Sequence, residues 1–139
     1  MKNKTNLINI ISSKQTNYNK IILEDKRLTE FNICIQNCLH TSKIDFDKDI
    51  YKNIILIVYS SNDELDSIKN IEKILQNCTT RTNNIPTFII IENNTEDDIV
   101  DIMTVFATYG FVPVAWGGDI DFIKEEDLID SLYLYYFYS

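Results

Sequence analysis

The chain has 139 residues, 45% of them hydrophobic and 12% aromatic, which predicts a single domain (residues 1–139) with a sizeable core. A formal net charge of −8 argues against a nucleic-acid-binding protein, because such proteins need clustered Lys and Arg. No apolar run approaches the roughly 20 residues of a membrane-spanning helix, and the apolar patch near the N-terminus is too short for a signal peptide. We therefore expect a cytoplasmic protein without a membrane span.

The N-terminal part of the chain is predicted to hold three strands. The first covers residues 7–12, and residues 1–19 as a whole are a candidate for a loosely attached strand and loop. Residues 20–25 and 30–36 give two more strands, and the short segment between them has the length of a hairpin connection. We expect these two strands to form an antiparallel hairpin.

The apolar stretch at residues 54–60 predicts the central strand of the fold. Its mostly β-branched residues do not alternate with polar ones, so both faces must be covered, as in the middle of a parallel sheet. Ser61 and Glu64 then have the spacing of a capping box, which predicts that a helix starts there. Residues 86–91 repeat the strand pattern, and residues 95–98 repeat the cap with Asp in place of Glu.

The C-terminal part predicts two helices around one more strand. A helix over residues 96–109 ends at Gly110, a residue type that is common in the left-handed conformation after a helix. Residues 111–116 are predicted as the last strand, with a turn at residues 117–118 and a final helix over residues 125–138.

Two strand-to-helix units in succession imply parallel crossover connections. We therefore expect an α/β three-layer sandwich with a mostly parallel sheet and an antiparallel hairpin at its N-terminal side.

Cysteine and histidine offer one candidate metal or catalytic cluster, formed by Cys34, Cys38, Cys78 and His40. Cys34 falls inside a predicted strand, and the spacing Cys-x3-Cys is not that of a zinc knuckle. A cysteine nucleophile would have to use His40 as its base, because the chain has a single His. We expect free thiols, no bound metal and no catalytic residue in this cluster.

Acidic residues follow two of the predicted strands. They are Glu92, Glu96, Asp97, Asp98, Asp119 and Asp121. Ligands of open parallel sheets bind at the carboxyl ends of the strands, so these acids could form a metal or acid–base site. Residues 96–98 are equally explained as acids that stabilise a helix N-terminus. We favour this structural interpretation and keep a small enzyme or ligand-binding protein, using strand-end carboxylates, as the alternative.

From residue 20 onward, the order of the predicted elements resembles a Ras-like GTPase domain that has lost its nucleotide site. Where that family has Asp-x-x-Gly, residues 36–39 are Gln-Asn-Cys-Leu, and where it has Asn-Lys-x-Asp, residues 93–96 are Asn-Asn-Thr-Glu. Neither GxGxxG nor GxxxxGK[ST] is present, and the segment between the first two predicted strands is too short for a phosphate loop plus a helix. We expect no nucleotide and no other cofactor.

Among such degenerate domains, the chain is most similar to the alpha- and gamma-adaptin-binding protein family. The similarity lies in residues 53–75, with the run IVYSS…LDSIKNI, and in residues 106–114, FATYGFVPV. It implies a non-catalytic interaction module of pseudo-GTPase type that handles adaptor subunits in vesicle trafficking.

The last predicted helix carries more apolar residues than one core-facing stripe can hold. Leu128, Leu132 and Tyr136 fill that stripe, which leaves Leu134, Tyr135 and Tyr138 to face outward. We expect these three residues to contact a protein partner or a second copy of the chain. The acidic rim of Glu96, Asp97, Asp119 and Asp121 would favour a partner with a basic surface. The alternatives are a structural subunit of a larger assembly, and a C-terminal segment folded back onto the sheet.

Overall fold

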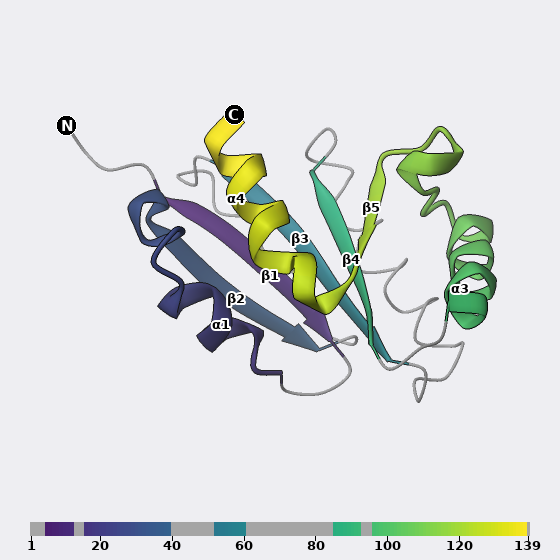
Figure 1. Ribbon diagram of the computed structural model, residues 1–139, viewed down its shortest axis with the longest axis horizontal. Coiled ribbons are helices and arrows are strands. Elements are labelled where there is room, and N and C mark those ends of the chain that lie inside the picture. The colour runs from purple at the N-terminus through teal and green to yellow at the C-terminus, as the bar shows by residue number, and fades with distance from the viewer. Residues whose placement is uncertain (1–4, 13–15, 40–51, 61–84, 93–95, 139) are drawn as a thin grey trace.

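The computed structural model describes residues 5–12, 16–39, 52–60, 85–92 and 96–138, and all structural statements below concern these ranges. Five parallel strands form one sheet in the order β2-β1-β3-β4-β5 (Figure 1). The strands are β1 (Asn6–Ser12), β2 (Ile33–Leu39), β3 (Lys52–Ser60), β4 (Thr87–Glu92) and β5 (Ile120–Ile123). The helices are α1 (Tyr18–Glu24), α3 (Glu96–Thr108) and α4 (Leu128–Tyr138), with short 3-10 turns η1 (Thr29–Phe31), η2 (Val114–Trp116) and η3 (Glu125–Asp127).

Strand β3 is buried on both faces, as the unbroken apolar sequence predicts. Ile55, Ile57 and Tyr59 pack on one face of the sheet with Phe106 of α3. Alternate residues of β3 pack on the opposite face with α1 and α4. Helices therefore cover both faces of a parallel sheet, and the fold is an α/β three-layer arrangement.

The predicted antiparallel hairpin is wrong. Residues 18–24 form helix α1, and β1 pairs with β2 in parallel, so a helical crossover joins these two strands. Tyr18 and Ile22 lie one helical turn apart and are both buried against the sheet, whereas Ile21 and Leu23 are exposed. This short apolar run is ambiguous between strand and helix, and its tertiary contacts decide in favour of the helix.

The N-terminal strand is an interior element of the sheet and is not loosely attached. Every residue of β1 from Asn6 to Ser12 is buried, and the strand pairs with β2 on one side and with β3 on the other. Because β1 forms no edge, the rest of the sheet depends on it.

The predicted strand at residues 111–116 is also wrong. Residues 114–116 form the turn η2, and only Pro113 makes an isolated bridge, to Ile120. The strand at this edge of the sheet is β5, which begins at Ile120, three residues after Gly117. Gly110 and Gly117 both have positive φ, at 93° and 88°, which confirms the left-handed residue predicted after the helix at Gly110.

The predicted strand at residues 7–12 corresponds to β1. The predicted strand at residues 30–36 is confirmed only in part, because residues 29–31 form η1 and β2 covers Ile33–Leu39. Strands at residues 54–60 and 86–91 correspond to β3 and β4, and helices at 96–109 and 125–138 correspond to α3 and to η3 with α4. The helix predicted to start near Ser61 lies outside the described residues. No helix within those ranges is long and apolar enough to cross a membrane.

Candidate functional site

Three side chains from separate parts of the chain meet at the carboxyl edge of the sheet. Glu92 is the last residue of β4, Glu125 follows the end of β5, and Tyr18 begins the helix that follows β1. The strand order of this sheet reverses between β1 and β3, and ligands of doubly wound sheets bind at the carboxyl ends of the strands beside such a reversal.

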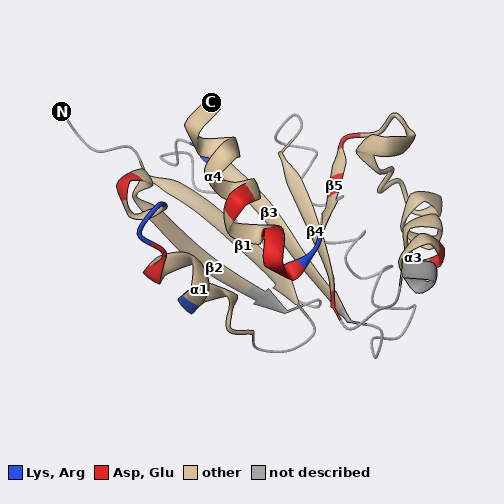
Figure 2. Cartoon of the chain, in the orientation of Figure 1, with Lys and Arg blue, Asp and Glu red and all other residues tan. Residues whose placement is uncertain are grey.

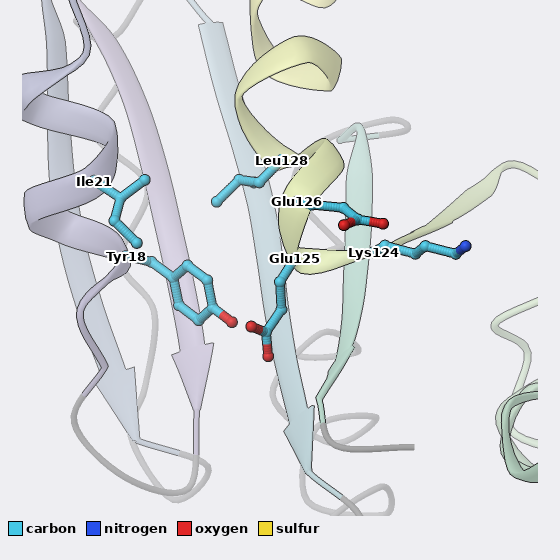
Figure 3. A pocket seen from close by; sticks show the side chains of 6 residues that line it. All are labelled: Tyr18, Ile21, Lys124, Glu125, Glu126 and Leu128. Atoms are coloured by element: carbon cyan, nitrogen blue, oxygen red, sulfur yellow. The ribbon is translucent and has the colours of Figure 1, made fainter. Parts of the chain in front are cut away.

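The Tyr18 hydroxyl connects these elements. The side chain is 6% exposed, and its hydroxyl donates a hydrogen bond of 2.8 Å to Oε2 of Glu92. Figure 3 shows the Glu125 carboxylate and the Tyr18 hydroxyl pointing toward one another. Burial raises the pKa of Tyr18, and the hydrogen bond to Glu92 and the charge of Glu92 raise it further. Tyr18 is therefore a permanent hydrogen-bond donor at neutral pH.

Glu92 and Glu125 form an interacting carboxyl pair. Partial burial raises the pKa of Glu125 first, and the charge of Glu92 and a hydrogen bond with Glu92 raise it further, while the hydrogen bond with Tyr18 lowers it. The raised pKa of Glu125 therefore follows first from its burial and then from the nearby charge of Glu92.

An open pocket of about 400 Å³ lies beside Tyr18 and Glu125. Its walls are formed by Tyr18, Ile21, Lys124, Glu125, Glu126 and Leu128. Ile21 and Leu128 provide an apolar side, and Glu125 and Glu126 an acidic side (Figure 3). Figure 2 shows acidic residues in η3 and in the first turn of α4, with a basic residue directly before η3. The pocket is therefore amphipathic, with negative charge at one side.

No metal centre is formed by the described part of the chain. Within it, no group of three or more His, Cys, Asp or Glu side chains is placed to hold an ion. Cys34 is a free, exposed thiol on β2. His40 and Cys78, and the side chain of Cys38, lie outside the described residues.

The predicted acidic rim is divided between opposite ends of the sheet. Asp119 and Asp121 are exposed, but they lie at the amino end of β5, because the strand preceding them in the prediction does not exist. Glu96 and Asp97 begin α3, after the carboxyl end of β4, and their side chains lie outside the described residues. Asp119 and Asp121 therefore do not belong to the carboxyl edge.

The predicted outer face of the last helix is correct for two of its three residues. Leu134 and Tyr138 are exposed, by 52% and 78%. Tyr135 instead packs against β4 and β3: its ring centroid lies 6.2 Å from that of Phe88 and 5.6 Å from Nζ of Lys52. Phe137, which the sequence analysis did not select, is 58% exposed.

Two residues of the carboxyl edge were missed by the sequence analysis. Tyr18 lay in a segment predicted as a polar loop, and Glu125 was assigned only to the start of the last helix. Glu125 carried a usable signal, since it closely follows the strand-like run at residues 120–123. Tyr18 carried none, because its position depends on a helix that the sequence pattern did not distinguish from a strand.

No protein-family model, curated protein or solved structure matches this chain. The resemblance to the adaptin-binding family stays a prediction, although the hairpin on which it partly rested is absent. Residues 13–15, directly after β1, lie outside the described ranges, so the expected lack of a phosphate loop is a prediction as well.

Proposed function

We propose that this protein binds a small organic cation in the pocket at the carboxyl edge of its sheet. The observation that carries the proposal is the convergence of Glu92, Glu125 and Tyr18 beside a pocket of about 400 Å³. A convergent set of polar groups in a concave site at this edge is the usual arrangement of a ligand site in an open α/β sheet.

The two sides of the pocket define the ligand class. The Glu125 carboxylate, backed by Glu92, would accept hydrogen bonds from an ammonium or guanidinium group. Ile21 and Leu128 would pack against an apolar stem. The net charge of −8 would attract cations to the protein and repel anions. An alkylammonium ion combines the required charge with the required apolar stem.

Calorimetric titration with hexylammonium chloride, with hexanoate and hexanol as matched probes, tests this proposal. We expect saturable binding of hexylammonium alone. Glu125→Gln should weaken it by about ten- to a hundredfold, the range expected for loss of a hydrogen bond to a charged group. Asp119→Asn removes one negative charge at the opposite end of the sheet and should leave the affinity nearly unchanged. Equal binding of hexanol, or equal weakening by both substitutions, would contradict a site at Glu125.

As a second candidate function, we propose self-association through the outer face of α4. The specific observation is a continuous exposed apolar surface formed by Leu134, Phe137 and Tyr138. Residues 131–138 carry no formal charge in a chain of net charge −8. Two copies can therefore bring these faces together without placing like charges in contact.

Sedimentation velocity over a range of protein concentrations tests self-association. Phe137→Ser combined with Tyr138→Ser should convert a dimer into a monomer. Val100→Ser is a matched control, because Val100 is 55% exposed on α3, which packs on the other face of the sheet. A monomer at all concentrations, or a dimer that survives the double substitution, would exclude this contact.

A further inference from the structure

We propose that the outer edge of β2, the side of the strand that faces away from β1, binds an extended peptide segment of another protein as a sixth strand of the sheet. Among the described residues, β2 ends the sheet and pairs with β1 alone. The peptide would pair through its backbone and place apolar side chains at alternate positions beneath α1. This surface is separate from the pocket at the carboxyl edge and from the outer face of α4.

A backbone hydrogen bond at the start of β2 shows which of its groups face outward. The amide of Asn6 donates a hydrogen bond of 3.0 Å to the carbonyl oxygen of Asn32. The N–H and C=O of one trans peptide unit point in opposite directions, so the amide of Ile33 points away from β1. Because backbone groups alternate along a strand, the amides of Ile35 and Asn37 point outward as well. The outer edge of β2 therefore presents a row of backbone donors and acceptors.

The two edges of the sheet differ in their protection against strand pairing. β5 has only four residues, including the exposed Asp121, and the amide of Ile120 already donates a hydrogen bond of 3.1 Å to the carbonyl oxygen of Val112. β2 has seven residues, and residues 31–39 contain neither a formal charge nor a proline. Short length and charged side chains are common means of keeping an edge strand from pairing. β2 has neither, so it is the edge that accepts a strand.

One face of an added strand would lie against an apolar flank of α1. Ile21 and Leu23 lie roughly 100° to either side of the buried Ile22 on the helix. Ile21 lines the pocket beside the start of α4, so Leu23 lies on the flank of α1 that faces away from α4. Leu23 is 49% exposed, and Ile33 and Ile35 are half-buried on the same face of the sheet. Apolar side chains at alternate positions of a peptide would cover Leu23 and extend this face.

The position of α1 favours a single strand over a second copy of the chain. Figures 1 and 3 show α1 over and beside β2, the outermost strand. Two β2 strands can pair symmetrically only as antiparallel neighbours, which places both α1 helices on the same face of the joined sheet. Neighbouring strands lie about 4.8 Å apart, whereas the axes of packed helices lie about 8–10 Å apart. Two α1 helices would therefore overlap, and a peptide without a helix avoids this clash.

Amide exchange measured by NMR on the full chain tests the outer edge directly. In the protein alone, exchange should be slow at Cys34 and Gln36, whose amides face β1, and fast at Ile35 and Asn37. The probe is a peptide of alternating Val and Thr with a Lys at each end. It should slow exchange at Ile35 and Asn37 by about tenfold or more.

Three results of this experiment would overturn the proposal. Exchange that is already slow at Ile35 and Asn37 without peptide would show that the chain itself covers the edge. Exchange that slows only as the protein concentration rises would identify a second copy as the occupant. No slowing at any soluble peptide concentration would show that the edge does not accept a strand.

Two N-methylated forms of the peptide provide a matched control on the wild-type protein. One form carries the methyl groups on the nitrogens of its Val residues and the other on those of its Thr residues, so each form blocks the donors of one peptide edge. Only one edge can face β2, so one form should lose binding and the other should keep it. Fluorescence anisotropy of labelled peptides measures both affinities. Equal affinities would mean that the peptide adheres through its side chains and does not add as a strand.

Substitutions in the protein separate the backbone contact from the side-chain contact. Asn37→Pro removes an outward amide and should weaken peptide binding by about ten- to a hundredfold, whereas Asn37→Ala keeps that amide and should bind like the wild type. Leu23→Ser should weaken binding by about tenfold. Val100→Ser, at an exposed position of α3 on the other face, should not weaken it.

Circular dichroism establishes that each variant is folded before its affinity is measured. Equal affinities of Asn37→Pro and Asn37→Ala, or of Leu23→Ser and Val100→Ser, would contradict strand addition at β2. If Asn37→Pro does not fold, the two N-methylated peptides make the same distinction on the unaltered chain. None of these measurements contains hexylammonium, so their outcome is independent of the proposed cation site.

Discussion

The hydroxyl of Tyr18 donates a hydrogen bond of 2.8 Å to Glu92, and the two residues are 74 positions apart in the chain. The bond joins the start of α1, the helix that follows β1, to the carboxyl end of β4. In the sheet, β3 lies between β1 and β4. It therefore fixes one wall of the pocket to the sheet and keeps the carboxylate of Glu92 in place.

Tyr18→Phe should destabilise the protein by about 1–2 kcal/mol, since hydrogen bonds to charged groups contribute about 1.5–3 kcal/mol and this one is only partly buried. The ring remains, so its packing against the sheet is preserved. Urea denaturation followed by circular dichroism measures the change in the free energy of unfolding.

The control for this experiment is Tyr138→Phe. Tyr138 is 78% exposed, and removal of its hydroxyl should change the free energy of unfolding by less than about 0.5 kcal/mol. If both substitutions had the same small effect, the bond between Tyr18 and Glu92 would contribute nothing to stability.

Alkaline pH should unfold this protein through its buried tyrosines. Burial raises the pKa of Tyr136 above its usual range, and the charge of Tyr135 raises it further. In the unfolded chain the phenol ionises near pH 10, so above that pH the folded state binds more protons than the unfolded state. The free energy of unfolding should therefore be insensitive to this group below about pH 9 and fall as the pH rises above about 10.

Tyr136→Phe should reduce the slope of this alkaline loss by up to about 1.4 kcal/mol per pH unit, the value for one proton. Urea denaturation at a series of pH values between 8 and 11 measures the slope. Tyr138→Phe again serves as the control and should leave the slope unchanged. An unchanged slope in Tyr136→Phe would mean that Tyr136 ionises in the folded protein.

The central strands could be predicted from the sequence because burial on both faces leaves a signal within the strand itself. Residues 54–60 are apolar without alternation, and β3 is covered on both sides. Helix α1 left no such signal, because seven residues contain only two turns and its buried positions are just Tyr18 and Ile22. The four residues of β5 include the exposed Asp121, and their strand conformation depends on pairing with β4.

The carboxyl-edge site could be predicted only in part for the same reason. Glu92 follows an identifiable strand, so its place at a strand end was expected. Glu125 is at this edge because β5 precedes it, and Tyr18 is there because α1 is a helix that follows β1. The positions of Tyr18 and Glu125 therefore depend on α1 and β5, the two elements that the sequence analysis assigned incorrectly. The incorrect assignment around β5 also placed Asp119 and Asp121 at the carboxyl edge in the prediction.

Phe106→Ala should be among the most damaging single substitutions in α3. Phe106 is fully buried, and its ring contacts those of Tyr59, Phe111 and Phe122 at centroid distances of 5.2, 5.7 and 5.7 Å. Truncation leaves a cavity that these rings cannot fill, and we expect a loss of about 3–5 kcal/mol. Val100→Ala, at an exposed site of the same helix, should change stability by less than about 0.5 kcal/mol. Thermal and urea denaturation of the two variants provide the comparison.

The last prediction concerns the turn that leads into β5. A Cβ atom at Gly118 would lie 2.0 Å from the carbonyl oxygen of Val112. This oxygen also accepts a hydrogen bond of 3.1 Å from the amide of Ile120, the first residue of β5. A side chain at residue 118 must therefore push apart the backbone that starts the edge strand. At Gly117 a Cβ atom would meet nothing within 4 Å, and only the positive φ of 88° opposes it.

Comparison of substitutions at the two glycines therefore distinguishes the cost of a backbone clash, at Gly118, from the cost of an unfavourable φ, at Gly117. Gly118→Ala should cost about 3 kcal/mol, at the upper end of ordinary overpacking, whereas Gly117→Ala should cost about 1 kcal/mol, the usual cost of a left-handed residue with a Cβ atom. Equilibrium urea denaturation gives the order of the two. Amide exchange at Ile120 and Phe122 should accelerate more in Gly118→Ala, because these residues pair with β4 through the displaced strand. A larger loss in Gly117→Ala would show that Val112 yields to the new methyl group and that the left-handed turn, not the close approach, determines the start of β5.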